Sequence, residues 1–375
     1  CQLSYSKNIE ELKLACKSEN TAKSWNALAQ YYYDKGNEEL LKDAANKAHE
    51  LAIKEKSDLG IGTSLLLLAQ VNYINQWSEY ITHISEALKY LEKTDSIRLQ
   101  VDAISSLGYA YNNISQYDEA IKQYKESIKR IQGQEKIKRY LAPAYINTGF
   151  AFLYKGQIDS TLNYITKAQE IASTLRDTTV LIACHDQLGI IHKRQGNQAL
   201  ALEQFNQSLE LYKSTQNYKA VCITLANISS VYNDWMRPDE ALFFIREAVK
   251  YAYRNPEDEF NLGRTLNQLG ILLCNKKNYI EGLDTLRLAT PMLKENKYVG
   301  LSNFLGLSNA YHNLNHIDSA DIYMEKVENT LAENKNLSPY LYYGEKGAQL
   351  SERGRYYEAI SLLEKYIEET QNAQK

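Results

Sequence analysis

A pattern of small and large residues recurs at nearly equal intervals and constrains the fold of this 375-residue chain more than any other feature. Its clearest copy is the segment 107–127, LGYAYNNISQYDEAIKQYKES. A helical period places Gly108 and Tyr111 on one face of a first helix, and Ala120 and Tyr124 on one face of a second. Polar residues between the two interrupt the apolar pattern. The segment therefore predicts a helical hairpin, in which small residues let the two helices approach closely.

The hairpin pattern continues to the end of the chain. The small position recurs at almost constant spacing, as Gly108, Gly149, Gly189, Ser229, Gly270, Ser308 and Gly347. The large position of the second helix is filled by Tyr124, Ile165, Phe205, Ile245, Leu286, Met324 and Leu363. Two further copies precede these, beginning near Trp25 and Leu68. Because one hairpin cannot bury its own apolar face, we expect about nine hairpins that stack on one another.

These residues resemble the signature of the tetratricopeptide repeat (TPR) family, which is a tryptophan, Leu-Gly, Tyr, Ala, a large residue and Ala. The first copy carries Trp25, Leu28, Ala29, Tyr32, Gly36, Ala45 and Ala48. The resemblance implies an all-α fold, a right-handed superhelical solenoid of about nine TPR hairpins. The period is about 40 residues, against roughly 34 in the ordinary repeat, so the chain is similar to long-period members. These include kinesin light chains, regulators of the Rap type and the TPR sensor regions of bacterial envelope regulators.

Two segments are expected along the chain. Residues 1–21 form an N-terminal anchor or cap, with a short amphipathic helix over 7–19, and residues 22–375 form the solenoid of nine repeats. The connections between repeats are short and polar, so no linker is long enough to separate domains. The last stretch, 356–375, is either a true cap or the point at which a longer protein was cut.

Composition is consistent with a folded binding domain. Hydrophobic residues make up 44% of the chain and charged residues 24%, while the net charge is only −3. A nearly neutral balance argues against a broad nucleic-acid or membrane-lipid surface, so we expect no nucleic-acid partner for this region. No apolar run approaches the roughly 18 residues of a membrane-spanning helix.

No motif in the sequence indicates catalysis. It contains no GxGxxG, Walker loop, GxSxG or HExxH. His312 and His316 are four residues apart, but the repeat pattern predicts a turn between them. Cysteines at 16, 184, 222 and 274 have neither paired spacing nor a CxxC motif, so we expect buried free thiols. The sequence predicts no enzyme, no cofactor and no metal site.

A binding groove is the better candidate for a functional site. In TPR proteins the first helix of each repeat lines a concave groove. The resemblance assigns to it Asn26, Gln30, Tyr33, Asn72, Tyr73, Tyr109, Asn112, Asp186, Lys193, Asn233, Asn267, Asn309 and His312. The family's charged clamp for a peptide carboxylate, built from paired Lys, Asn and Arg, is missing, so recognition of chaperone tails is not expected.

A run of asparagines recurs near the ends of the first helices. Its members are Asn72, Asn112, Asn233, Asn275 and Asn313. An asparagine amide both donates to and accepts from an extended peptide backbone, so these residues form either a peptide-binding ladder or a set of helix-end caps. In either case we expect a protein or peptide ligand in the concave groove.

The first residue, Cys1, suggests a location. A mature bacterial lipoprotein begins with a cysteine that carries lipid; a coincidental boundary is the alternative. On the lipoprotein hypothesis the domain is periplasmic or outward-facing in the cell envelope. It is then a lipoprotein, or the sensor part of a membrane-spanning signalling or transcriptional regulator. Membrane contact would come only through lipid on Cys1 or an adjacent segment. The alternative is a cytoplasmic TPR scaffold or a Rap-like, peptide-responsive regulator.

Overall fold

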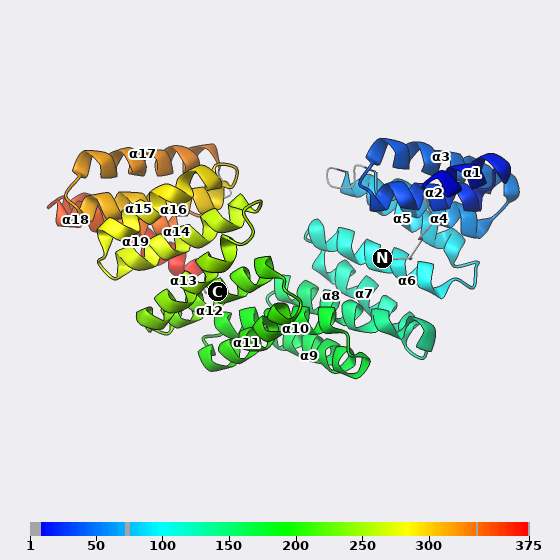
Figure 1. Cartoon of the computed structure of the whole chain (residues 1–375), viewed down its shortest axis with the longest axis horizontal. Coiled ribbons are helices and arrows are strands. Elements are labelled where there is room, and N and C mark those ends of the chain that lie inside the picture. The colour runs from blue at the N-terminus through cyan, green and yellow to red at the C-terminus, as the bar shows by residue number, and fades with distance from the viewer. Residues whose placement is uncertain (1–8, 72–75, 335–336, 374–375) are drawn as a thin grey trace. The chain divides into compact units, whose positions relative to one another are not determined.

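The computed structural model describes residues 9–71, 76–334 and 337–373, and helices joined by short turns make up its structure over them (Figure 1). The described residues form nineteen α-helices and two short 3-10 helices, and no strand. The predicted all-α class is therefore confirmed. A cap helix, α1 (Ile9–Ser18), precedes nine antiparallel pairs of a first and a second helix.

The pairs follow one another in chain order. They are α2 (Ala22–Asp34) with α3 (Glu38–Glu55), α4 (Asp58–Ala69) with α5 (Trp77–Leu91), α6 (Ile97–Asn113) with α7 (Tyr117–Ile131), α8 (Leu141–Tyr154) with α9 (Ile158–Leu175), α10 (Thr178–Arg194) with α11 (Gln198–Ser214), α12 (Tyr218–Asp234) with α13 (Pro238–Ala252), α14 (Glu259–Asn275) with α15 (Tyr279–Ala289), α16 (Lys297–Asn313) with α17 (Ile317–Glu333), and α18 (Tyr340–Glu352) with α19 (Tyr356–Ala373). The 3-10 helices η1 (Glu135–Tyr140) and η2 (Thr290–Leu293) lie between repeats. The nine predicted hairpins are all present.

Close helix contact explains the repeated small position. A Cβ atom added at Gly108 would lie 2.6 Å from the Tyr124 ring, and one at Gly189 would lie 2.7 Å from the Phe205 ring. Where serine replaces glycine, its hydroxyl makes a hydrogen bond across the same seam. Ser229 Oγ donates to the carbonyl oxygen of Ala241 at 2.7 Å. The position thus accepts only a residue that is very small or that bonds to the facing helix.

Every hairpin turn that lies wholly within the described residues uses the same backbone device. Seven residues after the small position, the chain adopts a left-handed conformation, for example at Ser115 (φ 61°) and Met236 (φ 58°). The next amide then bonds back to the first helix, as Gln116 N does to the Tyr111 oxygen at 2.8 Å. This geometry is the Schellman motif, which satisfies the last carbonyls of the first helix and reverses the chain.

The chain divides into two compact units, Cys1–Gln187 and Leu188–Lys375. The boundary falls inside α10 and not at a linker. In each unit, first helices of successive hairpins contact one another, for example α2 with α4, and α14 with α16. Second helices contact the first helix of the following hairpin. Each unit is thus a stack of hairpins with the first helices on one side; the division into residues 1–21 and 22–375 stays a prediction.

The N-terminal helix and the thiols are in the expected environments. Leu12 and Cys16 of α1 are buried in one cluster with Leu28 of α2, so α1 covers the start of the first hairpin. The cysteines at 16, 184, 222 and 274 are buried and free. Burial raises the pKa of the Cys184 thiol to about 12. Across the described ranges, no helix combines the length and the hydropathy that crossing a membrane requires.

Candidate functional site

In the second unit, two adjoining hollows lie along the first helices, and we call them together the amide groove. The first has a volume of about 440 Å³ and lies against α12, α14 and α16. The second has a volume of about 270 Å³ and lies against α14, α16 and α18. Ile271, Asn275 and Ser302 line both hollows, so the two are continuous.

The first hollow is lined mainly by neutral polar side chains. Its lining residues are Ala226, Asn227, Ser230, Asn233, Arg264, Asn267, Gln268, Ile271, Leu272, Asn275, Tyr298, Val299 and Ser302. The second hollow is more apolar, with Ile271, Cys274, Asn275, Ser302, Leu305, Gly306, Asn309, Leu341 and Glu345. Side-chain amides concentrate on the first helices because the opposite faces of these helices carry the apolar residues that pack in the seams.

A buried network fixes how one of these amides is oriented. Asn303, which is 1% exposed, donates from Nδ2 to the carbonyl oxygen of Leu286 at 3.1 Å and to Asn267 Oδ1 at 3.2 Å. Thr290 Oγ1 donates to Asn303 Oδ1 at 2.9 Å. Since Asn267 must turn its oxygen toward Asn303, its Nδ2 group remains the part available in the hollow.

The predicted groove residues of the second unit fall into two groups. Asn233 and Asn267 line the first hollow, and Asn309 lines the second, where its Nδ2 donates to Glu345 Oε1 at 2.9 Å. The other two lie beside carboxylates. Lys193 lies 3.4 Å from Asp234, and His312 Nε2 lies 2.7 Å from a carboxylate oxygen of Glu352.

The predicted residues of the first unit are more scattered. Asn26 and Gln30 line a hollow of about 490 Å³ against α1, α2, α4 and α6; Asn26 Nδ2 donates to the Gly60 oxygen at 3.2 Å. Tyr109 packs edge-on against Trp77, with ring centroids 5.7 Å apart. The remaining members are Tyr33, an exposed side chain on α2, Asn112, on α6 with a buried Oδ1, and Asp186, on α10. Asn72 and Tyr73 lie outside the described residues, as does Cys1, so the roles assigned to these three stay predictions.

The asparagine run divides between its two alternatives. Asn233 and Asn275 line the first hollow, as a ladder requires. Asn313 Nδ2 instead donates at 2.9 Å to the carbonyl oxygen of Asn309, four residues earlier on its own helix, as a helix-end residue does. The position relative to the small residue does not separate the two groups, because Asn275 and Asn313 both lie five residues after theirs. The ladder itself stays a prediction.

Sequence reasoning missed Arg264, Gln268, Asn227 and the buried Asn303. The first two lie on the same face of α14 as Asn267 and Asn275, at helical spacings of three, four and seven residues. Following that face in both directions from Asn267 would have found them. Asn303 could not be found in the sequence, because it is buried behind Asn267 and its role is recognised only from its hydrogen bonds.

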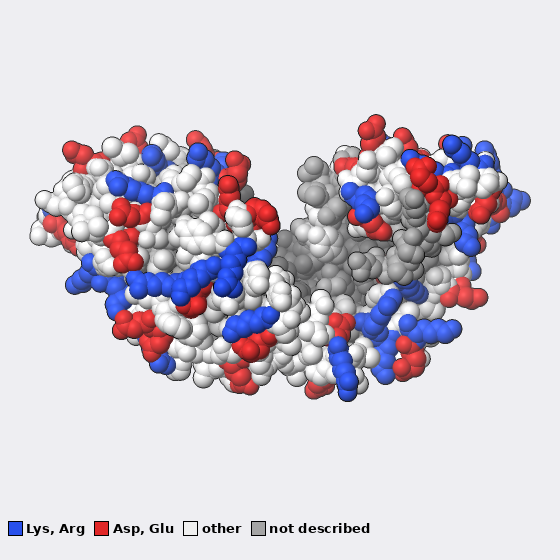
Figure 2. Space-filling model, viewed as in Figure 1, with Lys and Arg blue, Asp and Glu red and all other residues white. Residues whose placement is uncertain are grey.

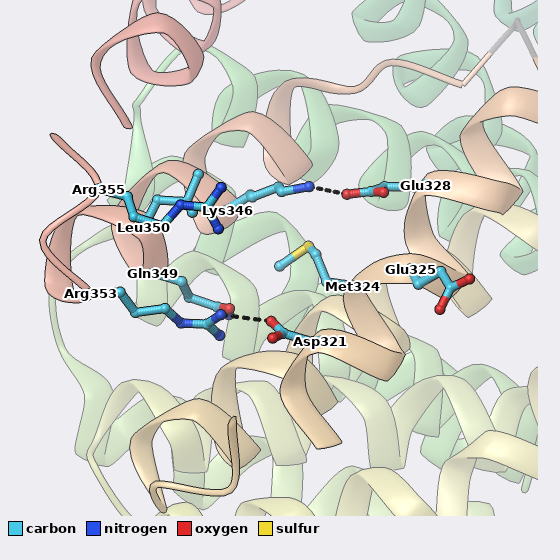
Figure 3. Close-up of a pocket in the computed structure, with 9 residues that line it drawn as sticks. All are labelled: Asp321, Met324, Glu325, Glu328, Lys346, Gln349, Leu350, Arg353 and Arg355. Carbon is cyan, nitrogen blue, oxygen red and sulfur yellow. Dashed lines mark hydrogen bonds and ion pairs between the residues drawn. The ribbon is translucent and has the colours of Figure 1, made fainter. Parts of the chain in front are cut away.

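In a further hollow of this unit, basic and acidic side chains pair with one another. Figure 3 shows the hollow of about 230 Å³ between α17 and α18, with Lys346 directed at Glu328 and Arg353 at Asp321. The second pair is 2.8 Å apart, and Lys346 and Glu328 are in direct contact. Since these cations already have carboxylate partners, this hollow offers little uncompensated charge to a ligand. On the visible face of both units, acidic side chains lie beside the basic ones (Figure 2).

Tetratricopeptide repeat profiles match residues 101–132 and 140–214. No curated protein is significantly similar in sequence. Among solved structures, the apo form of RapI superposes with a TM-score of 0.72 at 16% identity, over 94% of this chain and 98% of that one. The apo form of the quorum sensor NprR from B. thuringiensis has a TM-score of 0.60 at 15% identity, over 95% and 99%. A Rap protein complexed with competence and sporulation factor has a TM-score of 0.55 at 11% identity, over 97% and 99%.

At these identities the similarity to solved structures concerns the fold alone. The two matched segments, together with the nine long-period hairpins and the small-residue seam within them, agree on the family. The chain is a tetratricopeptide-repeat protein.

Proposed function

We propose that this chain is a non-catalytic, peptide-responsive regulator that binds a protein or peptide segment in the amide groove. The observation that carries the proposal is the groove itself, in which Asn227, Asn233, Asn267, Gln268 and Asn275 line one continuous depression. Amides both donate and accept, so they match the alternating N–H and C=O groups of an extended backbone. The groove has few titratable side chains, and no nucleophile is paired with a base among its described residues.

The groove dimensions indicate the size of the ligand. It spans four first helices, α12, α14, α16 and α18. Three steps between packed helices, each about 9 Å, make about 27 Å. At about 3.3 Å per residue, an extended peptide of about eight residues covers that span.

Solved structures of the same fold support a regulatory role. One is a quorum sensor, and another is a Rap protein in complex with competence and sporulation factor. These descriptions belong to those proteins, and the proposal extends to this chain only the idea of a fold that responds to a bound signal. The envelope location suggested by Cys1 is a separate proposal, and groove binding does not depend on it.

A blocked-groove variant tests the proposed function. A synthetic pool of random octapeptides is passed over the purified chain, retained peptides are sequenced, and the affinity of each is measured by fluorescence anisotropy. Ser302→Trp fills the junction of the two hollows, and its control, Ser361→Trp, places the same side chain on the exposed face of the second helix α19. We expect at least a tenfold loss of affinity for Ser302→Trp only. Equal binding by both variants, or no retained peptide, would contradict the proposal.

A further inference from the structure

The contact between α17 and α18 differs from the corresponding contacts earlier in the chain. In α7 and α11, the residues one and eight positions after the small alanine are apolar, buried and packed toward the following first helix. They are Ile121, Ile128, Leu202 and Leu209. The same two positions of α17, counted from Ala320, carry Asp321 and Glu328. Two carboxylates therefore lie where apolar side chains join successive hairpins elsewhere.

The facing residues of α18 differ in a matching way. In five other first helices the residue just before the small position is buried and apolar, namely Leu107, Leu188, Ile228, Leu269 and Leu307. In α18 this residue is Lys346, and it contacts Glu328. Arg353, which follows α18 directly, pairs with Asp321 at 2.8 Å. Ion pairs thus join these two helices at positions that are apolar in other hairpins.

The ionic contact is also loosely packed. A hollow of about 230 Å³ lies between α17 and α18, and all four charged side chains line it (Figure 3). Both helices are described over their whole lengths, and they are not packed as closely as α11 with α12 or α13 with α14. Tyr342 of α18 packs on an apolar cluster that includes Met324. Gln349 Nε2 donates to Ser308 Oγ of α16 at 3.1 Å. Polar groups therefore supply a large part of the attachment of α18.

The strength of this attachment should depend on ionic strength. The side chains of Arg353 and Lys346 are 21% and 30% exposed, and those of their partners Asp321 and Glu328 are 58% and 39% exposed. Ion pairs that solvent reaches are weak and are screened by salt, whereas burial of apolar surface involves no charges to screen. Added NaCl should thus loosen α18 more than it loosens α12 or α14.

We propose that the hairpin of α18 and α19 is a movable wall of the amide groove, held closed by its two ion pairs with α17. The helix α18 contributes Leu341 and Glu345 to the second hollow. Movement of this hairpin away from α16 and α17 therefore opens that hollow to solvent. The movement goes beyond the proposed function and does not require a bound peptide.

A native thiol reports on this movement. Cys274 is 5% exposed and lines the second hollow together with Leu341 and Glu345. Burial and the charge of Glu345 raise the pKa of the Cys274 thiol to about 11. Departure of α18 removes both causes, so Cys274 should then react faster with iodoacetamide. Cys222 of α12 is the internal control, because it is 1% exposed and lies in an apolar cluster away from α18.

The test measures the alkylation rates of Cys274 and Cys222 in the purified chain by mass spectrometry at one fixed pH. The NaCl concentration is raised from about 0.1 M to about 1 M, which shortens the Debye length from about 10 Å to about 3 Å. We expect Cys274 to react about threefold faster or more at high salt, and Cys222 to react at an unchanged rate.

Variants identify the ion pairs as the cause. Glu328→Gln should accelerate alkylation of Cys274 at low salt, and exchanging the charges with Glu328→Lys and Lys346→Glu together should restore the slow rate. Glu325→Gln is the matched control, because Glu325 lines the same hollow but makes no ion pair within the described part of the chain.

Two results would overturn the movable wall. One is a Cys274 rate that neither salt nor Glu328→Gln changes. The other is equal acceleration of Cys274 and Cys222, which would mean that the whole unit opens. Either result would leave the proposed function standing, because retention of peptides by the unaltered chain and their loss in Ser302→Trp are measured separately.

Discussion

Replacing Gly189 with alanine tests the close helix contact that defines the repeats. The added Cβ would lie 2.7, 2.8 and 2.9 Å from three ring atoms of Phe205. Real Cβ atoms do not approach so closely, and the ring is fully buried at 0% exposure, so it cannot turn away into solvent. Either the ring leaves its preferred rotamer or α10 moves away from α11.

The magnitude follows from two opposing terms. Overpacking a well-filled core costs about 1–3 kcal/mol. Alanine is a better helix former than glycine by about 1 kcal/mol, which offsets part of that cost. We therefore expect Gly189→Ala to lower the free energy of unfolding by about 1–2 kcal/mol, measured by urea denaturation followed by circular dichroism. Gly189→Leu, with a much larger side chain, should be worse.

Gly300 provides a matched control, because it is also a helical glycine but an added Cβ would meet only the Leu293 oxygen at 3.5 Å. Gly300→Ala should stabilise the chain by about 0.5–1 kcal/mol. Combining Gly189→Ala with Phe205→Leu should recover part of the loss, so the double-mutant cycle should give a favourable coupling. Equal effects of the two glycine substitutions, or zero coupling with Phe205→Leu, would refute the reasoning.

The turns, a buried thiol and the N-terminus supply the remaining predictions. Met236 is 87% exposed and has a left-handed backbone with φ 58°, a conformation that costs about 1 kcal/mol for any residue other than glycine. Met236→Gly should therefore raise the melting temperature. Gly196→Met, in the equivalent turn, should lower it. Burial raises the pKa of the Cys184 thiol from 9.0 to about 12, so its contribution to the free energy of unfolding is complete below pH 9 and is lost as the pH rises toward 12. In Cys184→Ala the free energy of unfolding should therefore fall less steeply between pH 9 and 12. The difference in slope should be at most about 1.4 kcal/mol per pH unit, measured by unfolding titrations at a series of pH values. Mass spectrometry of the native N-terminus should find an acylated Cys1 if the lipoprotein hypothesis is correct, and an unmodified one would end it.

The repeat architecture could be predicted from sequence because its determinants are local and periodic. The small residue at Gly108 and the ring at Tyr124 are 16 positions apart in the same hairpin, and the spacing recurs from copy to copy. The left-handed turn was less visible. Glycine marks it at 36, 156, 196 and 354, but Ser115 and Met236 adopt the same conformation with no glycine to indicate it. There the fold imposes a backbone that the residue does not prefer.

The groove was only partly predictable, because an asparagine near a helix end looks the same whether it caps the helix or faces a ligand. Asn275 and Asn313 both lie five residues after their small residues, yet Asn275 lines the hollow and Asn313 donates back to its own helix. Arg264 could have been found in the sequence, because it lies three residues before Asn267 on the same face of α14. That its Nη2 atom has no hydrogen-bond partner among the described residues is recognised only from the structure.

The most direct test of the central claim is to locate a bound peptide on the protein. A retained octapeptide is resynthesised with a benzophenone side chain, irradiated with the purified full chain, and the cross-linked residues are identified by mass spectrometry. The structure predicts cross-links on α12, α14 and α16, at or beside Asn233, Gln268 and Ser302, and their loss in the Ser302→Trp variant. Cross-links confined to second helices such as α13 and α15 would contradict binding in the amide groove.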